Sequence, residues 1–279
     1  VIMSITFEKV KTLKGSITVP SDKSITHRAF IFSSMAEGVS EVLNPLMSRD
    51  TIATMNAMKA AGVEFKEING GFEIISNGYK NFKEPTDVIN CENSGTTSRL
   101  ITGVFAPMGK YVVLTGDSSL RRRPMDRVKN PLSIMGADIR LRGNKFLPMT
   151  ILPAKMHPAH LTAKVSSAQV KSAVIIAGLQ LEGETSYTEK ETTRNHTETM
   201  LKDYGVDISV EGKKITVKGE AKLIPQQFEV PGDFSSAAFF IGAALMFENS
   251  EIEIKSVGLN PTRTGLLTVL KNMGVDAIV

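Results

Sequence analysis

Several residue types are scarce in the 279-residue sequence, and each scarcity excludes something. There is one cysteine, Cys91, so we expect neither a disulfide framework nor a zinc site made of cysteines, and a reducing compartment is favoured. Tryptophan is absent and aromatic residues make up 6% of the chain, which leaves few rings on which nucleic-acid bases could stack.

Long apolar runs are also missing. The runs AVIIAGLQL and AAFFIGAALMF fall far short of the roughly 20 apolar residues that cross a bilayer, so they are predicted to be core helices. The first ten residues, VIMSITFEKV, show no basic segment followed by an apolar stretch, so no signal peptide is predicted. We therefore expect a cytoplasmic protein.

Motifs for metals and for common nucleophiles are lacking as well. The four histidines, His27, His157, His160 and His196, form no HExxH pattern. Neither a GxSxG sequence nor a P-loop occurs. The sequence therefore predicts no metal site.

Composition and charge are those of a globular protein with a mild basic bias. Hydrophobic residues make up 42% of the chain and charged residues 22%, enough for a sizeable core. The length fits one large domain or two ordinary ones. The net charge of +4 suits an anionic ligand but is too small to indicate a nucleic-acid-binding protein.

A pattern repeats along the chain. Four helical segments end at Gly62, Gly136, Gly205 and Gly274, which are 74, 69 and 69 residues apart. Glycine stops a helix because it tolerates positive φ, and an alternating strand pattern follows each one. Another helix ends about 25 residues before each glycine. The unit therefore comprises a strand, a helix, a strand, a helix and two strands, which predicts an α/β fold built by duplication with its last copy unfinished.

The first helix of each copy begins with residues that suit an anion. Hydroxyl residues can cap these helices: Ser24, Ser94 with Thr96, Ser166 with Ser167, and Ser235 with Ser236. Cations stand beside three of the caps: Lys23 and Arg28, Arg99, and Lys171. The helix dipole disfavours a cation there unless an anion lies between it and the free N–H groups. We therefore predict anion-binding sites and a substrate with two or more anionic groups.

The second helices repeat this theme in SRDT, RRRPMDR, TTRNHTE and NPTRTG. Pro124 fits a first helical turn. Three successive arginines, Arg121, Arg122 and Arg123, cannot all point one way, so we expect one at a site and the others in solvent.

Seven motifs, in order along the chain, resemble those of the 5-enolpyruvylshikimate-3-phosphate synthase family. They are VPSDKSITHRA, NSGTTSRL, LTGDSSLRRRPM, SSAQVKSAVIIAGL, TTRNHTETML, VPGDFSSAAFF and NPTRTGLL. The resemblance implies an inside-out α/β barrel of two domains, each made of three βαβαββ units. One complete domain is expected at residues 20–230, and residues 1–19 with 231–279 are expected to belong to an incomplete second domain. The crossings at VPSDK and VPGDF are expected to be hinges.

The resemblance also implies an activity. Members of the family transfer the enolpyruvyl group of phosphoenolpyruvate to the 5-hydroxyl of shikimate 3-phosphate and release phosphate, a step of the shikimate pathway of aromatic amino-acid biosynthesis. The reaction uses no metal and no organic cofactor. The expected partners are these two small molecules, with no nucleic acid and no membrane, and the protein is expected to be a monomer.

Carried over motif by motif, the resemblance assigns the site. Lys23 is expected to contact both substrates and to be catalytic. The residues expected at shikimate 3-phosphate are Lys23, Ser24, Arg28, Ser167, Ala168, Gln169, Thr193 and Arg194. Those expected at phosphoenolpyruvate are Lys23, Gly95, Arg123 and Gln169. Gly95 leaves room beside phosphoenolpyruvate, which in this family implies sensitivity to glyphosate.

The chain departs from the family in two ways. Glu92 stands where the family usually has glycine, which adds a negative charge near a predicted anion site. The family's chains are also about half as long again, and the Asp and Glu credited with proton transfer lie in the additional part. We therefore expect the 279-residue chain alone to be inactive while retaining weak binding of shikimate 3-phosphate.

Three alternatives remain open. A transferase of enolpyruvyl to UDP-N-acetylglucosamine has the same repeat but usually carries a cysteine in the loop corresponding to SSLRRRPM, where this chain has none. An RNA-binding protein or RNA-phosphate cyclase has a related repeat and would suit the basic run RRRPMDR. The chain could also be a non-catalytic half that works with a separate C-terminal chain.

Overall fold

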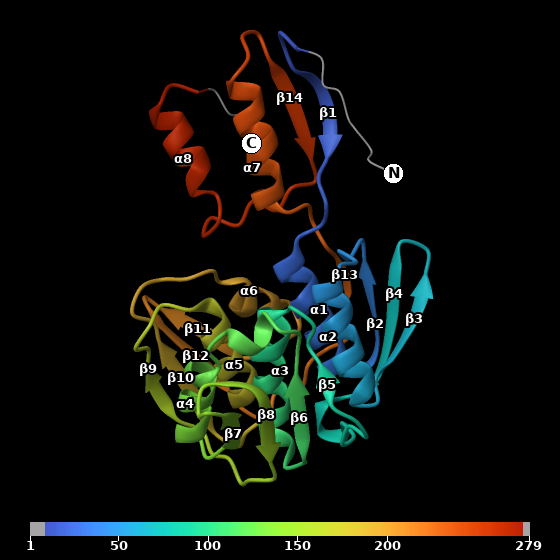
Figure 1. Ribbon diagram of the computed structural model, residues 1–279, viewed down its shortest axis with the longest axis vertical. Helices are drawn as coiled ribbons and strands as arrows, with labels where there is room; N and C mark the ends of the chain where they lie inside the picture. Colours follow the sequence, from blue (N-terminus) through green and yellow to red (C-terminus); the bar gives the residue numbers. More distant parts are fainter. Residues whose placement is uncertain (1–8, 276–279) are drawn as a thin grey trace. The chain divides into compact units, whose positions relative to one another are not determined.

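The computed structural model describes residues 9–275, and the chain divides into two compact units (Figure 1). Unit 1 comprises Val1–Asp22 with Pro231–Val279, and unit 2 comprises Lys23–Val230. Both crossings fall in the proline-containing segments VPSDK and VPGDF. The strand expected after Gly274 lies mostly outside the described residues.

Unit 2 contains three four-stranded sheets of one topology. In each, an edge strand runs parallel to its neighbour, and the other two strands extend the sheet in antiparallel pairs. The first sheet orders β13 (Gln227–Glu229), β2 (Glu37–Leu43), β4 (Gly71–Asn77) and β3 (Glu64–Ile68). The second orders β5 (Ile89–Asn90), β6 (Val112–Thr115), β8 (Phe146–Leu152) and β7 (Asp138–Arg142). The third orders β9 (His160–Thr162), β10 (Glu184–Thr188), β12 (Lys214–Lys218) and β11 (Ile208–Glu211).

The first sheet takes its edge strand from the far end of the unit. β13 pairs in parallel with β2, so that Phe228 lies opposite Val42, although the two residues are widely separated in sequence. Because β13 pairs with β2, the first sheet has the same four-strand pattern as the other two.

Six α-helices connect the strands of unit 2. They are α1 (Lys23–Met35), α2 (Arg49–Ala60), α3 (Gly95–Phe105), α4 (Asp126–Ile134), α5 (Ala168–Gly178) and α6 (His196–Asp203). Short 3-10 turns lie at η1 (Tyr79–Asn81), η2 (Ala106–Met108) and η3 (Leu120–Arg122). The predicted βαβαββ duplication is confirmed in this unit.

The helices α1, α3 and α5 are buried while the sheets lie around them (Figure 1). In α1 every residue from Ile25 to Met35 is buried. Burial on all sides requires partners for the polar residues of the helix. The Ser34 hydroxyl donates to the Phe30 carbonyl at 2.7 Å, and the Ser33 and Tyr204 hydroxyls are 2.8 Å apart.

Unit 1 contains a two-stranded parallel sheet of β1 (Lys14–Thr18) and β14 (Glu251–Lys255), with α7 (Phe234–Leu245) and α8 (Gly265–Asn272). The prediction that serines cap α7 is wrong, because Asp233 is the N-cap and accepts from the Ser235 N–H at 2.8 Å. The side chain of Arg263, in the NPTRTG motif, is 5% exposed and bonds to Asp22 at 2.6 Å and Asp233 at 2.9 Å. Its guanidinium therefore forms ion pairs with two carboxylates of unit 1.

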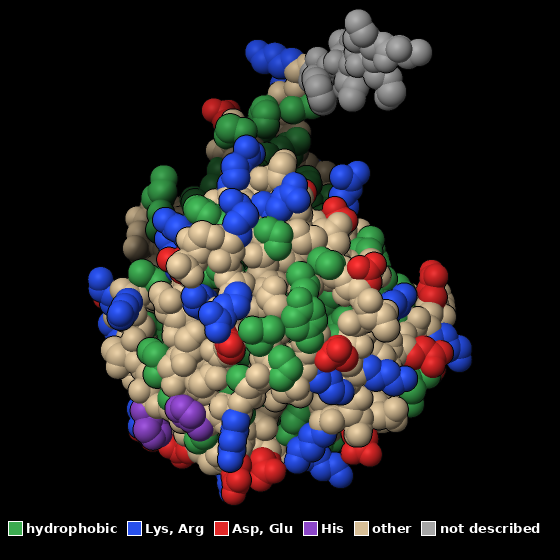
Figure 2. All heavy atoms as spheres, turned by 60° about the horizontal axis from the view of Figure 1, so that its bottom comes forward, with side chains coloured by type: hydrophobic (Ala, Val, Ile, Leu, Met, Phe, Trp, Pro, Cys, Tyr) green, Lys and Arg blue, Asp and Glu red, His purple; other side chains and the backbone are tan. Residues whose placement is uncertain are grey.

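The described helices include none with the length and apolar character needed to cross a membrane. On the face drawn in Figure 2, basic side chains are interspersed with acidic and hydrophobic ones. The predicted α/β fold class with duplicated units is confirmed by this architecture.

The close packing of α3 on α5 yields a prediction about stability. A Cβ added at Gly103 would lie 2.2 Å from the Ala173 carbonyl oxygen, so the two backbones must separate if any side chain is introduced. Gly103→Ala should lower the free energy of unfolding by about 2 kcal/mol, as overpacking does, despite the better helix propensity of alanine. Urea denaturation followed by circular dichroism measures this change.

The control is Gly242→Ala on α7, where an added Cβ has nothing within 4 Å. That substitution should be neutral or stabilising by up to about 1 kcal/mol. Equal effects of the two substitutions would contradict the close approach of α3 and α5.

Candidate functional site

The N-termini of α3 and α5 are capped and joined to each other. Ser94 caps α3 and Ser167 caps α5, each accepting a backbone N–H of its own first turn. The Gln169 side chain then bridges the two helices: its Nε2 donates to Thr96 Oγ1 at 3.0 Å, and its Oε1 accepts from Arg99 Nη1 at 2.6 Å. Two of the helix starts predicted to bind anions therefore lie side by side.

The N-terminal part of α1 is joined to both of these helices. Lys23 forms an ion pair with Asp50 at 3.0 Å, and the Asp50 carbonyl accepts from the Thr97 hydroxyl at 3.1 Å, which links α1 and α2 to α3. Arg28 Nη2 donates to Ser172 Oγ at 2.8 Å, which links α1 to α5. The three helix starts that the sequence singled out in this unit thus form one cluster.

Guanidinium groups converge over Gly95. A Cβ at this position would lie 2.7 Å from Arg99 Nη1 and 3.6 Å from Arg123 Nη1, so there is little room for a side chain. Arg123 itself is exposed and bonds to the Asn93 side chain. Burial lowers the pKa of Arg99, and the positive charges of Arg123 and Arg127 lower it further. This crowding of like charge favours an anion at the start of α3.

All three arginines of the triplet are exposed, and they differ in what lies next to them. Arg121 and Arg122 are exposed in η3, and Arg123 alone of the three is near Gly95. Whether Arg123 contacts a phosphate remains a prediction.

Arg28 is buried, and three of its nitrogens donate within the protein. Nε donates to Thr197 Oγ1 at 2.8 Å, Nη1 to the Ser24 carbonyl at 3.0 Å, and Nη2 to Ser172 Oγ at 2.8 Å. The guanidinium therefore supports the starts of α1, α5 and α6 whether or not it also reaches a ligand. Ser24 is half-buried and Lys23 is exposed.

Thr193 and Arg194 lie in the segment between β10 and α6. The backbone N–H of Thr193 donates to Glu189 Oε1 at 3.1 Å, and its hydroxyl donates to the same oxygen. Both donors of Thr193 are thus used by the protein, and a contact with a phosphate stays a prediction. Arg194 is exposed, as is Ser166.

The prediction that Lys171 flanks an anion site is wrong. Its ammonium is fully buried, 3.2 Å from Glu189 Oε2 and 2.6 Å from Glu198 Oε1. The sequence showed a cation near a helix start but not the two carboxylates, which come from other elements. The negative charge that offsets Lys171 at this helix start therefore comes from Glu189 and Glu198.

A hydroxyl network behind the cluster contains a buried histidine. His27 Nδ1 is 2.7 Å from Thr54 Oγ1, which is 2.7 Å from Thr97 Oγ1. The Thr97 hydroxyl is in turn 2.7 Å from the capping hydroxyl of Ser94. Desolvation, with the charges of Arg28 and Lys23, lowers the pKa of His27 to about 3, so the ring is neutral at neutral pH.

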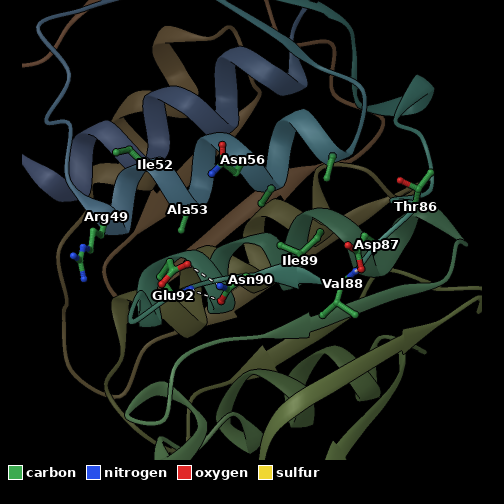
Figure 3. Close-up of a pocket in the computed structure, with 12 residues that line it drawn as sticks. Arg49, Ile52, Ala53, Asn56, Thr86, Asp87, Val88, Ile89, Asn90 and Glu92 are labelled. Atoms are coloured by element: carbon green, nitrogen blue, oxygen red, sulfur yellow. Dashed lines mark hydrogen bonds between the residues drawn. The ribbon is translucent and has the colours of Figure 1, made fainter.

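Glu92 has a left-handed backbone, with φ 50°, which accounts for a preference for glycine at this position. Its carboxylate accepts from Asn90 Nδ2 at 2.7 Å and lines a cavity of about 520 Å³ between α2 and residues 86–92 (Figure 3). Ile52, Ala53, Ile89 and Val88 form apolar parts of the wall. The residues predicted to bind substrate do not line this cavity.

Sequence reasoning missed several residues of the cluster. Asp50, Thr97, Glu189 and Glu198 act through contacts between elements distant in sequence, and no local pattern marks them. Within residues 9–275, no group of three or more His, Cys, Asp or Glu side chains could hold a metal ion.

The duplicated βαβαββ units of unit 2 and the converging, cation-bearing helix starts agree with the fold that the sequence motifs implied. A family model for EPSP synthase (3-phosphoshikimate 1-carboxyvinyltransferase) matches residues 7–278. The chain belongs to the EPSP synthase family.

Individual relatives agree with this. The chain is 50% identical over 267 residues to the 3-phosphoshikimate 1-carboxyvinyltransferase of Carboxydothermus hydrogenoformans, covering 95% of this chain and 62% of the relative. It is 47% identical over 278 residues to that of Petrotoga mobilis, covering 98% and 64%. A solved EPSP synthase from Acinetobacter baumannii superposes with a TM-score of 0.90 at 41% identity, covering 95% and 60%. The chain thus spans less than two thirds of the length of these relatives.

The buried histidine predicts how stability depends on pH. Because the pKa of His27 is about 3 in the folded chain, below its ordinary value of 6.5, protonation favours the unfolded chain. The free energy of unfolding should therefore fall as the pH drops from 6.5 towards 3, by up to about 1.4 kcal/mol per pH unit from this residue.

His27→Asn is the matched variant, because its amide group can replace the contact of Nδ1 with Thr54 while it does not titrate. Urea denaturation between pH 7 and pH 4.5 should show a shallower loss of stability for the variant than for the parent. Parallel pH profiles would contradict the assignment of a depressed pKa to His27.

Proposed function

We propose that this chain provides the shikimate 3-phosphate-binding part of a 3-phosphoshikimate 1-carboxyvinyltransferase. The whole enzyme transfers the enolpyruvyl group of phosphoenolpyruvate to the 5-hydroxyl of shikimate 3-phosphate and releases phosphate. The observation that carries the proposal is the cluster of helix starts in unit 2, where Lys23 lies at the start of α1 and Arg99 and Arg123 lie near the capped start of α3. The relatives' names, at up to 50% identity, support the reaction.

The charge of the substrates matches the cluster. Phosphoenolpyruvate and shikimate 3-phosphate together carry about six negative charges at neutral pH. Removing such charges from water is costly unless fixed cations and N–H groups replace the lost hydration. Guanidinium groups suit this because their planar forks bind carboxylate and phosphate through two hydrogen bonds.

For shikimate 3-phosphate, we propose contacts with the start of α5, where Ser167, Ala168 and Gln169 lie, and with Thr193 and Arg194. Each of these α5 residues is half-buried, so it is accessible while its helix is fixed in the core. Ser24 and Arg28 at the start of α1 would hold the carboxylate of the ring.

For phosphoenolpyruvate, we propose the start of α3 at Gly95, where the guanidinium groups of Arg99 and Arg123 lie close to the backbone. Gln169, on α5, bonds to Thr96 and Arg99 of α3, so its side chain would approach both substrates. Lys23 is the proposed catalytic residue of this chain, an exposed ammonium held by Asp50. A small analogue such as glyphosate would compete at the same position.

The proton-transfer groups are expected elsewhere. In the relatives more than a third of the length lies outside the matched region, and we propose that the Asp and Glu that move protons belong to that part. Positioned acid–base groups contribute about 10² to 10⁴ in rate, so the 279-residue chain by itself should bind substrate without measurable turnover. A separate chain that supplies this part would restore turnover.

The proposal includes a cytoplasmic location, a monomeric state, small-molecule substrates and no organic cofactor. The alternative of an RNA-binding protein is disfavoured by the low aromatic content, which leaves few rings for base stacking. An affinity for RNA that falls steeply with salt would favour it instead.

Calorimetric titration with shikimate 3-phosphate tests the proposed function directly. We expect saturable binding to the 279-residue chain with one site, and no comparable heat from UDP-N-acetylglucosamine. The absence of heat from shikimate 3-phosphate at millimolar concentration would refute the proposal.

The assignment of Arg123 gives a second prediction. A charge-assisted hydrogen bond contributes about 1.5–3 kcal/mol, so Arg123→Ala should weaken phosphoenolpyruvate binding to the chain saturated with shikimate 3-phosphate at least about tenfold. Affinity for shikimate 3-phosphate should stay within about twofold, since Arg123 is not assigned to that substrate.

Arg122→Ala, which removes an exposed neighbour in the same triplet, is the control and should change neither affinity. Equal losses for both substrates in Arg123→Ala would show that this arginine acts on the fold of the cluster rather than on phosphoenolpyruvate.

A further inference from the structure

Unit 2 contains a lysine that is buried together with two glutamates. The Lys171 ammonium lies 3.2 Å from Glu189 Oε2 and 2.6 Å from Glu198 Oε1. The exposed fractions of the three side chains are 0%, 5% and 4%. We call these residues the Lys171 triad.

The triad connects three elements. Lys171 is in the first turn of α5, Glu189 follows β10, and Glu198 is in the first turn of α6. One ammonium therefore binds both ends of the segment 190–197 and ties them to α5.

Glu189 also holds the middle of this segment. Its Oε2 faces Lys171, while its Oε1 accepts both the N–H and the hydroxyl of Thr193. The Glu189 carboxylate thus connects Lys171 of α5 to Thr193, which precedes Arg194 in the chain.

Stability alone does not account for such a group. Burying three charged side chains costs desolvation, and apolar residues of similar volume often replace buried ion pairs without loss of stability. The helix dipole also opposes a lysine in the first turn of α5. What charged groups add here is a specific pairing, since one ammonium forms ion pairs with two carboxylates from different parts of the chain.

A second cation, Arg28, also connects α5 to α6. Arg28 Nε donates to Thr197 at 2.8 Å and Nη2 donates to Ser172 at 2.8 Å, and these hydroxyls are 2.6 Å apart. Thr197 adjoins Glu198 and Ser172 adjoins Lys171 in the sequence. The formal charges of Arg28 and the triad sum to zero, so the buried group as a whole is balanced.

We infer that Lys171, Glu189 and Glu198 are positioning residues that fix the segment 190–197 against the start of α5. This inference rests on the proposed function, because the two parts joined are those assigned to the phosphate of shikimate 3-phosphate: Ser167 to Gln169 on α5, and Thr193 with Arg194 on the segment. The triad touches no substrate itself. It holds one half of the phosphate site in register with the other.

The variant that tests this is Lys171→Met with Glu189→Gln and Glu198→Gln, which removes every charge of the triad and keeps the side-chain volumes close. The control is Lys66→Met with Glu73→Gln, an ion pair between β3 and β4 at 3.6 Å whose lysine is exposed. If the triple variant fails to fold, Glu189→Gln alone makes the same comparison, because it removes the charge that faces Lys171 but keeps an acceptor for Thr193.

Two measurements are made on the 279-residue chain. Amide hydrogen exchange without ligand should be at least tenfold faster across 190–197 in the triad variant and unchanged in the control. Calorimetry should show at least a tenfold loss of affinity for shikimate 3-phosphate, whereas shikimate, which lacks the phosphate, should lose less than threefold. A purely structural role would lower the melting temperature without changing the ratio of the two affinities.

Exchange across 190–197 within twofold of the parent would overturn the inference. It would also be overturned if the segment loosened while both ligands lost affinity equally or not at all. If the parent chain binds no shikimate 3-phosphate, the proposed function fails, and the exchange rates still decide whether the triad holds the segment.

Discussion

The starts of α1, α3 and α5 must satisfy their free N–H groups inside a packed unit, and most of the site follows from this requirement. These helices are surrounded by three sheets, so water cannot reach most of their length. Their N-terminal ends are left as the places where N–H groups can meet a ligand. Capping serines use part of this capacity, and Gln169 joins the ends of α3 and α5 so that they present one surface.

Close packing and charge constrain each other in this cluster. Gly95 and Gly103 both occur where an added Cβ would meet an atom within 3 Å, the first at a guanidinium and the second at a backbone carbonyl. The absence of side chains there lets Arg99 lie across the start of α3 and lets α5 approach. Burial lowers the pKa of Arg99, and the nearby positive charges of Arg123 and Arg127 lower it further, so like charges repel at this helix start. A bound anion would relieve that repulsion.

The cations near the helix starts have two different tasks. Arg123 and Lys23 are exposed and bond to Asn93 and Asp50, whereas Lys171 is buried between two glutamates and Arg28 is bonded to three neighbouring groups. The buried pair joins elements inside the core, whereas the exposed pair bonds to neighbouring groups and also faces solvent. A cation beside a cap therefore indicates a nearby negative partner, but that partner can be a ligand or the protein's own carboxylate.

The sequence by itself determined the repeat, the α/β class and the short-range features of the site. Glycine spacing, capping serines and the motifs around Lys23, Gly95 and Arg123 are local signals, and the residues that produce them are near neighbours in the chain. Only the tertiary structure decided that β13 completes the first sheet, that Lys171 is paired with Glu189 and Glu198, and that Glu92 turns to a cavity beside Asn90. Each of these depends on which segments meet after folding, and the free energy of a buried charge is set by those neighbours rather than by its position in the sequence.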